Sequence, residues 1–238
     1  TLYKEAKTIL LPELKEQILK DGAHFELSPM YHSLMTYRLL DCYNLVISND
    51  LFNRELETFL KKELEGMLSF LQAISFRNGY IPLMNDAANG IAPTPSELFD
   101  YAHRLGLDMR ESTLSDSGYR KFTSDSYELV LDVGEVGPSY QPGHAHADTF
   151  NFQMYINNRP VVIDTGTSTY EVNETRFYER STRAHNTVTI GDENSSQVWA
   201  GHRVAKRAKV EILKEDTNCI VARHDGYKKK FGVYHTRE

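Results

Sequence analysis

The chain has 238 residues, of which 40% are hydrophobic and 25% are charged, and its formal net charge is −6. This composition excludes an intrinsically disordered chain and leaves enough apolar residues for a core. No run approaches the roughly 20 apolar residues of a membrane-spanning helix, so we expect no membrane span.

The first half has the apolar spacing of helices. Ser28 and Pro29 are typical of an N-cap and a first helical position, and a Gly/Pro/Asn-rich loop covers residues 77–96. Cys42 lies in an apolar helical pattern, so we expect a small core residue there. The spacing predicts helices, in chain order, over residues 1–20 with a break at Pro12, from Pro29 to about Val46, over 52–75 and over 96–105.

After about residue 118 the apolar period changes to two, which is typical of an antiparallel sheet. Asn157 and Asn158 form a turn signal between two apolar runs. The predicted strands are 127–134, 150–156, 160–163, 186–190, 208–213 and 218–224. The sequence therefore predicts an α+β protein, with a helical part at residues 1–112 and an antiparallel β domain at 113–238.

The distribution of charge and of cysteine limits the partners. Residues 200–238 contain ten Lys and Arg against five Asp and Glu, so this segment is basic and the rest is acidic. A basic segment suits an anionic partner, or it is a solvated β-surface. Aromatic and basic residues do not interleave, so we expect no nucleic-acid partner. Two distant cysteines argue against a disulfide framework and a cysteine zinc site. The oligomeric state stays open.

The hexapeptide "GHAHAD" holds His144, His146 and Asp148. Histidines two positions apart on an extended backbone face the same way, which is a common arrangement of metal ligands. Asp148 is a candidate for holding a neighbouring imidazole by a hydrogen bond.

Two later residues extend this group. The predicted hairpin returns Asp164 opposite Asn151, and His185 begins another predicted strand. His146, Asp164 and His185 then provide two nitrogens and one oxygen, a set that suits zinc. This requires the chain to bend after His146. The alternative is a hydrogen-bonded His/Asp cluster at a sheet end.

The segment "DGAHFELSPMYH" crowds His24, Glu26, Tyr31 and His32 into a loop that runs into a helix start. Tyr31 falls in the first helical turn, where the helix dipole favours a phenolate and lowers the pKa of a tyrosine from about 10. The alternative is an aromatic residue that packs beside the core.

Four blocks, "DGAHFELSPMYH", "PGHAHADTFNF", "VVIDTGTSTY" and "RSTRAHNTVTI", together resemble the heparinase II/III family of polysaccharide lyases. They occur in the family's order and cover roughly residues 20–205. The resemblance implies an incomplete α/α toroid followed by an antiparallel β-sandwich-like domain. It also implies β-elimination on an acidic polysaccharide that contains uronic acid, such as heparin or heparan sulfate, and a periplasmic or secreted bacterial protein.

The resemblance also assigns residues. Tyr31 matches the family's catalytic tyrosine and His144 its catalytic histidine. His146, Asp164 and His185 match a structural metal site, for which we expect zinc. Substrate contacts are expected from His24, Glu26, Asn85 and Arg183, although Asn85 is equally typical of a turn and Arg183 is equally able to pair with local acids.

One departure from the family pattern affects the expected activity. The residue that neutralises the substrate carboxylate lies upstream of the tyrosine block in the family, and none of the thirty residues before Tyr31 matches it. We therefore expect an internal piece of a larger enzyme. Two alternatives stay open: a non-catalytic carbohydrate-binding module of the lyase fold, and a zinc-dependent hydrolase, whose HxHxDH pattern "HAHADT" partly matches.

Overall fold

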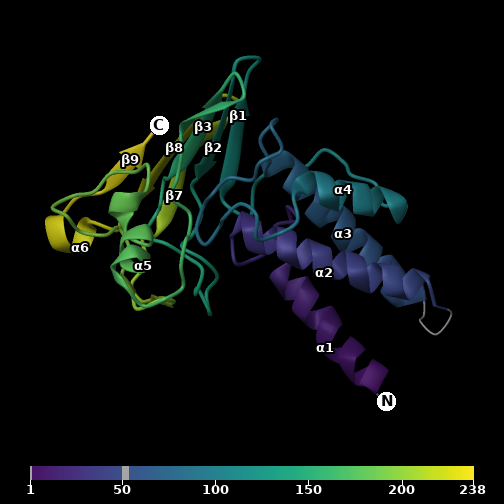
Figure 1. Cartoon of the computed structure of the whole chain (residues 1–238). Coiled ribbons are helices and arrows are strands. Elements are labelled where there is room, and N and C mark those ends of the chain that lie inside the picture. The colour runs from purple at the N-terminus through teal and green to yellow at the C-terminus, as the bar shows by residue number, and fades with distance from the viewer. Residues whose placement is uncertain (1, 50–53) are drawn as a thin grey trace.

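The computed structural model describes residues 2–49 and 54–238. Four helices come first: α1 (Leu2–Gln17), α2 (Pro29–Ile47), α3 (Arg54–Ile74) and α4 (Pro95–Arg104). They lie on one side of the molecule and the strands on the other (Figure 1). The Ser28 hydroxyl accepts a hydrogen bond from the Tyr31 amide at 3.2 Å, so the predicted N-cap of α2 is confirmed.

Two details of the helical part correct the sequence prediction. Helix α1 continues through Pro12 without the predicted break, although proline cannot donate a backbone hydrogen bond there. Cys42 is exposed, because the buried face of α2 is formed by neighbouring positions such as Leu40 and Tyr43. The described residues contain no helix that is both long and apolar enough to cross a membrane.

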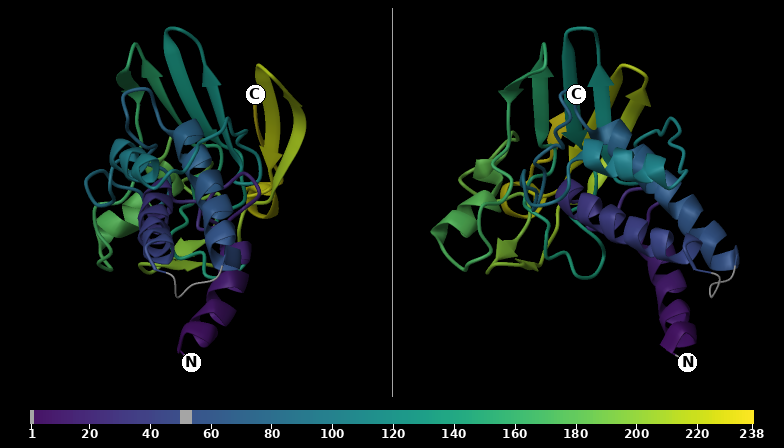
Figure 2. Two further views of the ribbon diagram at one scale, coloured as in Figure 1. Left: turned by 90° about the vertical axis from the view of Figure 1, so that its right-hand side faces the viewer. Right: turned by 45° about the vertical axis from the view of Figure 1, so that its right-hand side comes forward.

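The strands form three antiparallel sheets (Figure 2). The first sheet has the order β1-β2-β3-β4, a short hairpin pairs β5 with β6, and the third sheet has the order β7-β8-β9. The strands are β1 (Tyr119–Thr123), β2 (Tyr127–Asp132), β3 (Phe152–Ile156), β4 (Arg159–Val162), β5 (Val198–Trp199), β6 (Arg203–Val204), β7 (Val210–Asp216), β8 (Cys219–His224) and β9 (His235–Arg237).

The predicted turn at Asn157 and Asn158 is present. Both residues have positive φ, 49° and 61°, as a two-residue hairpin turn between β3 and β4 requires. The order of helices and then antiparallel sheets confirms the predicted α+β class.

Three apolar clusters hold these layers together. One fills the space between the helices around Leu60 and Leu64. A second joins the end of α3 to the first sheet and includes Phe70 and Val130. The third lies between the first and third sheets and includes Phe150 and Ile220. The first sheet is therefore covered by helix α3 on one face and by the β7-β8-β9 sheet on the other.

The predicted strand at 186–190 is wrong. Side-chain hydrogen bonds hold this segment in place of the backbone hydrogen bonds of a sheet. The side-chain amide of Asn186 donates to the carbonyls of Phe152 and Ile163, and the hydroxyl of Thr187 donates to the carbonyl of Thr149. The alternating apolar pattern at residues 186–190 therefore does not produce a strand. Several short elements have no signal in the sequence pattern: β1, β5, β6, β9, α5 (Glu174–Glu179), α6 (Lys228–Phe231) and a 3₁₀ turn at Thr182–Ala184.

Candidate active site

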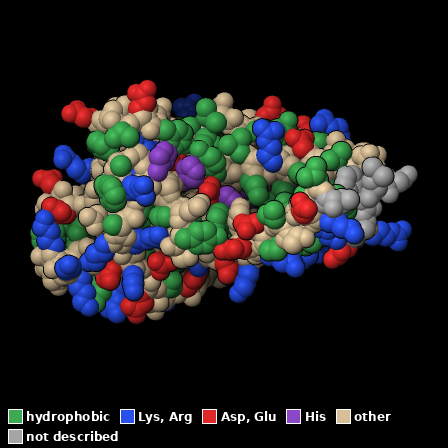
Figure 3. Space-filling model, turned by 90° about the horizontal axis from the view of Figure 1, so that it is seen from below, with side chains coloured by type: hydrophobic (Ala, Val, Ile, Leu, Met, Phe, Trp, Pro, Cys, Tyr) green, Lys and Arg blue, Asp and Glu red, His purple; other side chains and the backbone are tan. Residues whose placement is uncertain are grey.

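A cleft of about 630 Å³ opens where the helical part meets the β part. Its walls are Glu26, which precedes α2, the segment 141–144 and the segment 200–204, which includes β6. Histidine side chains gather in one region of the face shown in Figure 3, among apolar and basic side chains. The cleft is therefore lined by residues from distant parts of the sequence.

The ring of Tyr31 stacks on the imidazole of His144 beside this cleft. The ring centroids are 3.9 Å apart and the planes differ by 27°. Tyr31 stands in the first turn of α2, and its hydroxyl lies 3.0 Å from the hydroxyl of Tyr170. The Nε2 atom of His144 lies 3.7 Å from Oε2 of Glu26. The structure thus brings two phenols, an imidazole and a carboxyl group together from three segments.

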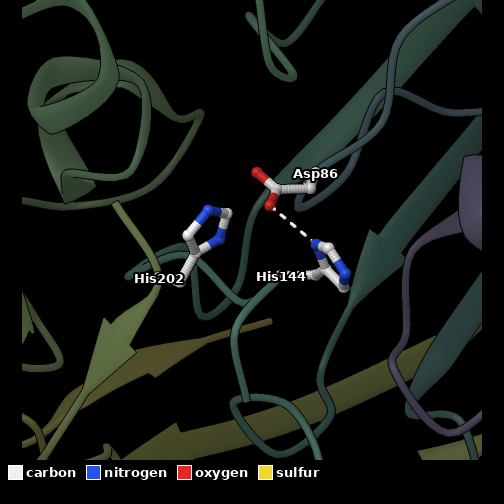
Figure 4. Close-up of side chains that lie close together, drawn as sticks. All are labelled: Asp86, His144 and His202. Atoms are coloured by element: carbon white, nitrogen blue, oxygen red, sulfur yellow. Dashed lines mark hydrogen bonds and ion pairs between the residues drawn. The ribbon is translucent and has the colours of Figure 1, made fainter. Parts of the chain in front are cut away.

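The carboxylate of Asp86 organises the two histidines of the "HAH" segment. It lies 2.9 Å from Nδ1 of His144 and 2.8 Å from Nε2 of His146 (Figure 4 shows the contact with His144). Arg176 of α5 donates to both carboxylate oxygens, with Nη2 2.8 Å from Oδ2. Because a carboxylate only accepts, His144 must carry its proton on Nδ1, and its Nε2 is left for other partners.

Burial and hydrogen bonding shift several ionisation equilibria here. Burial raises the pKa of Asp86, but the hydrogen bonds from His144, His146 and Arg176 outweigh it and hold that pKa well below its ordinary value. Burial, and then the hydrogen bond with Tyr31, raise the pKa of Tyr170. Asp86 is therefore an anion and Tyr170 a neutral phenol at neutral pH.

Asn85 fastens the "HAH" segment to the helical part. Its amide nitrogen donates to the Leu27 carbonyl at 3.0 Å and to the Tyr119 hydroxyl at 3.3 Å, and its Oδ1 accepts from the His146 amide at 3.0 Å. The side chain is buried and its polar atoms face inward. The polar atoms of Asn85 are thus taken up by protein partners, which position the loop that carries Asp86, and a contact with substrate stays a prediction.

The other expected substrate contacts lie in different places. Glu26 lines the cleft, and burial raises its pKa, although His144 opposes the shift. His24 is buried behind it, with Nδ1 3.7 Å from Oε2 of Glu26, so it supports the wall of the cleft. Arg183 is exposed on the 3₁₀ turn and does not line the cleft, so the structure separates it from Tyr31 and His144.

The bend after His146 is present. The Asn151 amide donates to the Asp148 carbonyl at 2.7 Å, and Phe150 has a φ of 69°. Asn151 also donates to Asp164 at 2.8 Å, as the hairpin register predicts.

The three expected zinc ligands are close together, but hydrogen bonds connect two of them. Nδ1 of His185 lies 2.8 Å from Oδ2 of Asp164, and the rings of His146 and His185 are 5.3 Å apart. Burial lowers the pKa of His185, but the charge and hydrogen bond of Asp164 outweigh it and raise that pKa overall. Asp164 thus orients the imidazole of His185.

Three atoms near this group have the chemistry of metal ligands. Nδ1 of His146, Nε2 of His185 and Oδ2 of Asp148 are all buried and have no hydrogen-bond partner. Buried polar atoms without partners are costly, so each of them favours a partner that the protein does not supply. Two imidazole nitrogens and a carboxylate oxygen are a donor set that suits zinc. In this arrangement Asp148 offers a free oxygen, whereas Asp164 is occupied by His185 and Asn151.

A second group, Asp86, His144 and His202, has one potential ligand atom of each residue within 4.8 Å of the others (Figure 4). Its chemistry does not favour a cation. Both oxygens of Asp86 already accept from the guanidinium of Arg176, which carries a positive charge. This group is better described as a charged hydrogen-bond network.

Four residues of the site were missed or left unassigned by the sequence analysis: Asp86, Tyr170, Arg176 and His202. Asp86 and Tyr170 lie inside loops whose composition is typical of turns, and only their burial and contacts distinguish them. An arginine and an exposed histidine carry no spacing signal. Tertiary contacts alone bring them to the cleft.

The fold and the cleft define an α+β protein with a tyrosine–histidine pair between its helical and β parts. Residues 2–101 match the family model "Heparinase II/III N-terminus", and residues 110–238 match "Heparinase II/III-like, C-terminal". The chain therefore belongs to the heparinase II/III family.

Named relatives agree with this assignment. The chain is 25% identical over 213 residues to a heparin-sulfate lyase of Pedobacter heparinus, in a match that covers 79% of this chain and 32% of that one. It is 26% identical to a heparin-sulfate lyase of Bacteroides stercoris, with 82% and 32% covered. A crystal structure of a mutant heparan sulfate lyase from Pedobacter heparinus has the same fold, with a TM-score of 0.70, 22% identity, and 97% of this chain and 38% of that one covered. The chain spans about a third of the length of these curated relatives.

Proposed function

We propose that this chain carries part of the active site of a polysaccharide lyase that cleaves a uronic-acid polysaccharide by β-elimination. The observation that carries the proposal is the stacking of Tyr31 on His144, 3.9 Å between ring centroids, beside a cleft between the helical and β parts. The relatives named as heparin-sulfate lyases favour a heparin- or heparan-sulfate-like substrate.

The proposed reaction explains why a phenol and an imidazole are needed in one place. The C5 proton of a uronate is weakly acidic, although it is alpha to a carboxyl group. A base must remove that proton while an acid protonates the departing glycosidic oxygen at C4. The C4–O bond breaks and a C4–C5 double bond forms. Two groups that reach the same sugar ring therefore divide the two proton transfers.

The contacts of His144 suit it to one of these roles. Asp86 holds its Nδ1–H, so the Nε2 lone pair is directed to partners other than Asp86. This geometry makes Nε2 a proton acceptor, and the imidazolium that results is stabilised by the Asp86 carboxylate. Glu26, 3.7 Å from the same Nε2, adds negative charge on that side.

Tyr31 is placed for the complementary transfer. Because the pKa of Tyr170 is raised, Tyr170 stays protonated. Its hydroxyl can therefore donate a hydrogen bond to the Tyr31 oxygen whenever Tyr31 is deprotonated. Tyr31 thus changes its protonation state without losing its hydrogen-bond partner.

The proposed zinc has a structural role. His146, His185 and a nearby carboxylate would hold it, and its charge would link the segment 143–148 to the segment after the 3₁₀ turn. The proton transfers described above take place at Tyr31 and His144. An acidic polysaccharide as partner, and a periplasmic or secreted location, are part of the same proposal.

The test is to incubate the protein with a panel of uronate polymers and follow the ultraviolet absorbance of the new C4–C5 double bond. Tyr31→Phe removes one hydroxyl and should lower the elimination rate by at least about 100-fold while binding persists. Tyr37→Phe, in the same helix, is the matched control and should keep the rate. New reducing ends without the absorbance would show hydrolysis and refute the proposal. An unchanged rate in Tyr31→Phe would refute the role of Tyr31.

A further inference from the structure

A second, smaller pocket lies beside the cleft, on the other side of the β5–β6 hairpin. Its volume is about 290 Å³, and Phe177, Arg180, Asn194 and residues 198–200 line it. Ala200 lines both this pocket and the cleft that contains His144. The two hollows are therefore neighbours that share one lining residue.

Two aromatic side chains form exposed walls of this pocket. Trp199 is 53% exposed and Phe177 is 44% exposed, although both are large apolar residues. Trp199 lies opposite Arg203 in the antiparallel β5–β6 pair. The guanidinium of Arg203 is 5.9 Å from the centre of the Trp199 ring, and Arg203 also lines the cleft. Flat aromatic surface beside a cation suits a ligand that has an apolar face and a negative charge.

Arg180 adds a buried positive charge that is in no direct ion pair, although the charge of Asp86 acts on it. It is 1% exposed, and its guanidinium donates to the carbonyls of Ala145 and Ala200. Its Nε has no hydrogen-bond partner. Within residues 2–49 and 54–238, Arg180 forms no ion pair with a carboxylate, whereas its neighbour Arg176 is paired with Asp86. Burial, and then the charge of Arg176, lower the pKa of Arg180 to about 10, so it remains charged at neutral pH.

A buried cation without a counter-ion is unfavourable, and an anionic ligand at the pocket relieves it. The carboxylate or sulfate of an acidic sugar supplies that charge. The apolar face of the same sugar ring suits the exposed faces of Trp199 and Phe177. Because Ala200 lines both hollows, a sugar here and a sugar at His144 are close enough in the fold to be treated as residues of one chain.

We propose that this pocket is a second saccharide subsite, in which an acidic sugar residue stacks on Trp199 and Phe177 with its negative group toward Arg180 and Arg203. The subsite rests on the proposed function, because its occupant is a more distant residue of the polysaccharide that is cleaved at His144. This subsite binds a sugar residue that is distant from the reacting ring, so the protein should bind long chains more tightly than short ones.

The first experiment uses intrinsic fluorescence. Trp199 is the one tryptophan in the sequence, so emission excited at the long-wavelength edge, where tyrosine does not absorb, comes from a side chain of this pocket. The protein is titrated with size-defined oligosaccharides of heparan sulfate, chondroitin sulfate, hyaluronan and alginate, and with maltodextrin of equal length as a neutral control. We expect a saturable change with at least one acidic oligosaccharide and a much weaker one with maltodextrin. No change with any acidic oligosaccharide, or an equal response to maltodextrin, would overturn the subsite.

The second experiment separates the subsite from catalysis. Trp199→Ala and Phe177→Ala should each raise the KM for a long oligosaccharide about fivefold. The value of kcat and the KM for the shortest substrate should not change. Trp199→Phe keeps an aromatic ring, so its KM for the long oligosaccharide should stay close to that of the unmodified protein. Arg203→Gln should weaken binding of acidic chains only. Tyr80→Ala and Arg159→Gln remove an exposed aromatic and an exposed arginine elsewhere and should have no effect.

An unchanged KM for the long oligosaccharide in Trp199→Ala would overturn the subsite while the lyase activity stands. The protein could also bind acidic oligosaccharides by fluorescence and yet show no elimination activity. If calorimetry then shows that Phe177→Ala weakens this binding, the subsite is supported and the proposed reaction is refuted. The two proposals therefore fail in different ways.

Discussion

The Asp86 carboxylate and the His144 imidazole form a hydrogen bond of 2.9 Å that connects the helical part to the β part. Asp86 belongs to the loop between α3 and α4, and His144 to the segment after β2. The same carboxylate is bound by Arg176, so its position and charge are set from the β side as well. This contact determines which nitrogen of His144 carries the proton.

Replacing Asp86 should impair both stability and turnover. Asp86→Asn leaves the buried guanidinium of Arg176 without a counter-ion and should lower the free energy of unfolding by about 3 kcal/mol. We also expect the elimination rate to fall about 100-fold, because His144 loses the carboxylate that sets its tautomer. Urea denaturation and the absorbance assay measure the two effects, and Asp192→Asn, at an exposed turn position, is the control.

A double variant distinguishes positioning from folding. Asp86→Asn combined with Arg176→Gln removes the unpaired charge and should recover much of the lost stability, whereas the rate should stay low and its pH profile should shift. A rate that recovers together with stability would show that Asp86 acts on the fold alone.

Zinc binding should depend on the group around His146 and not on the cleft. His146→Ala and His185→Ala should lose bound zinc, whereas His202→Ala should keep it, as measured by elemental analysis after dialysis. Asp148→Asn should also lose zinc, because Asp148 has the buried oxygen without a partner. Asp164→Asn should weaken zinc affinity by roughly 10- to 100-fold through the orientation of His185. Zinc retained by His146→Ala and lost by His202→Ala would contradict this assignment.

Stability should fall as the pH drops below about 6.5. Burial lowers the pKa of His32 to about 3 and that of His24 to about 4. Between these values and about 6.5 the unfolded chain binds protons that the folded chain does not, so acid favours unfolding. Each group contributes at most about 1.4 kcal/mol per pH unit, and less near pH 6.5, where the unfolded histidine is only half protonated. The two groups together therefore predict a loss of about 3 kcal/mol between pH 6.5 and pH 5.

Urea midpoints across this range test the slope, and the ring resonances of His24 and His32 in NMR test its cause. Both rings should stay neutral at pH 5. Resonances that titrate near pH 6.5, or a flat stability curve, would refute this explanation.

Gly22 should tolerate no side chain. Its φ is +89°, and a Cβ there would lie 2.2 Å from the carbonyl oxygen of Gly66 in α3. Gly22→Ala should lower the free energy of unfolding by roughly 3 kcal/mol, because both the backbone conformation and the close approach are disturbed. Gly66→Ala is the matched control: its added Cβ makes an ordinary contact of 3.9 Å, and alanine favours the helix. Equal destabilisation by both changes would show that the close approach is unimportant.

Local sequence patterns predict the order of helices and strands and the chemistry of the most distinctive residues. The change of apolar period from helical to alternating predicts helices before an antiparallel sheet, because each period places apolar side chains on one face of its element. Ser28 before Pro29 and the two asparagines at 157–158 act within a few residues of themselves, so their turn and cap were also predictable.

Tertiary structure alone decided which of these residues meet. Asp86 and Arg176 are 90 positions apart and form a buried ion pair that no local pattern encodes. The inward direction of Asn85, the hydrogen-bonded loop at 186–187 and the exposed ring of Trp199 likewise depend on packing between distant segments. Local patterns specify elements because they act through the backbone of neighbouring residues, whereas a site forms from side chains whose proximity depends on how whole layers pack.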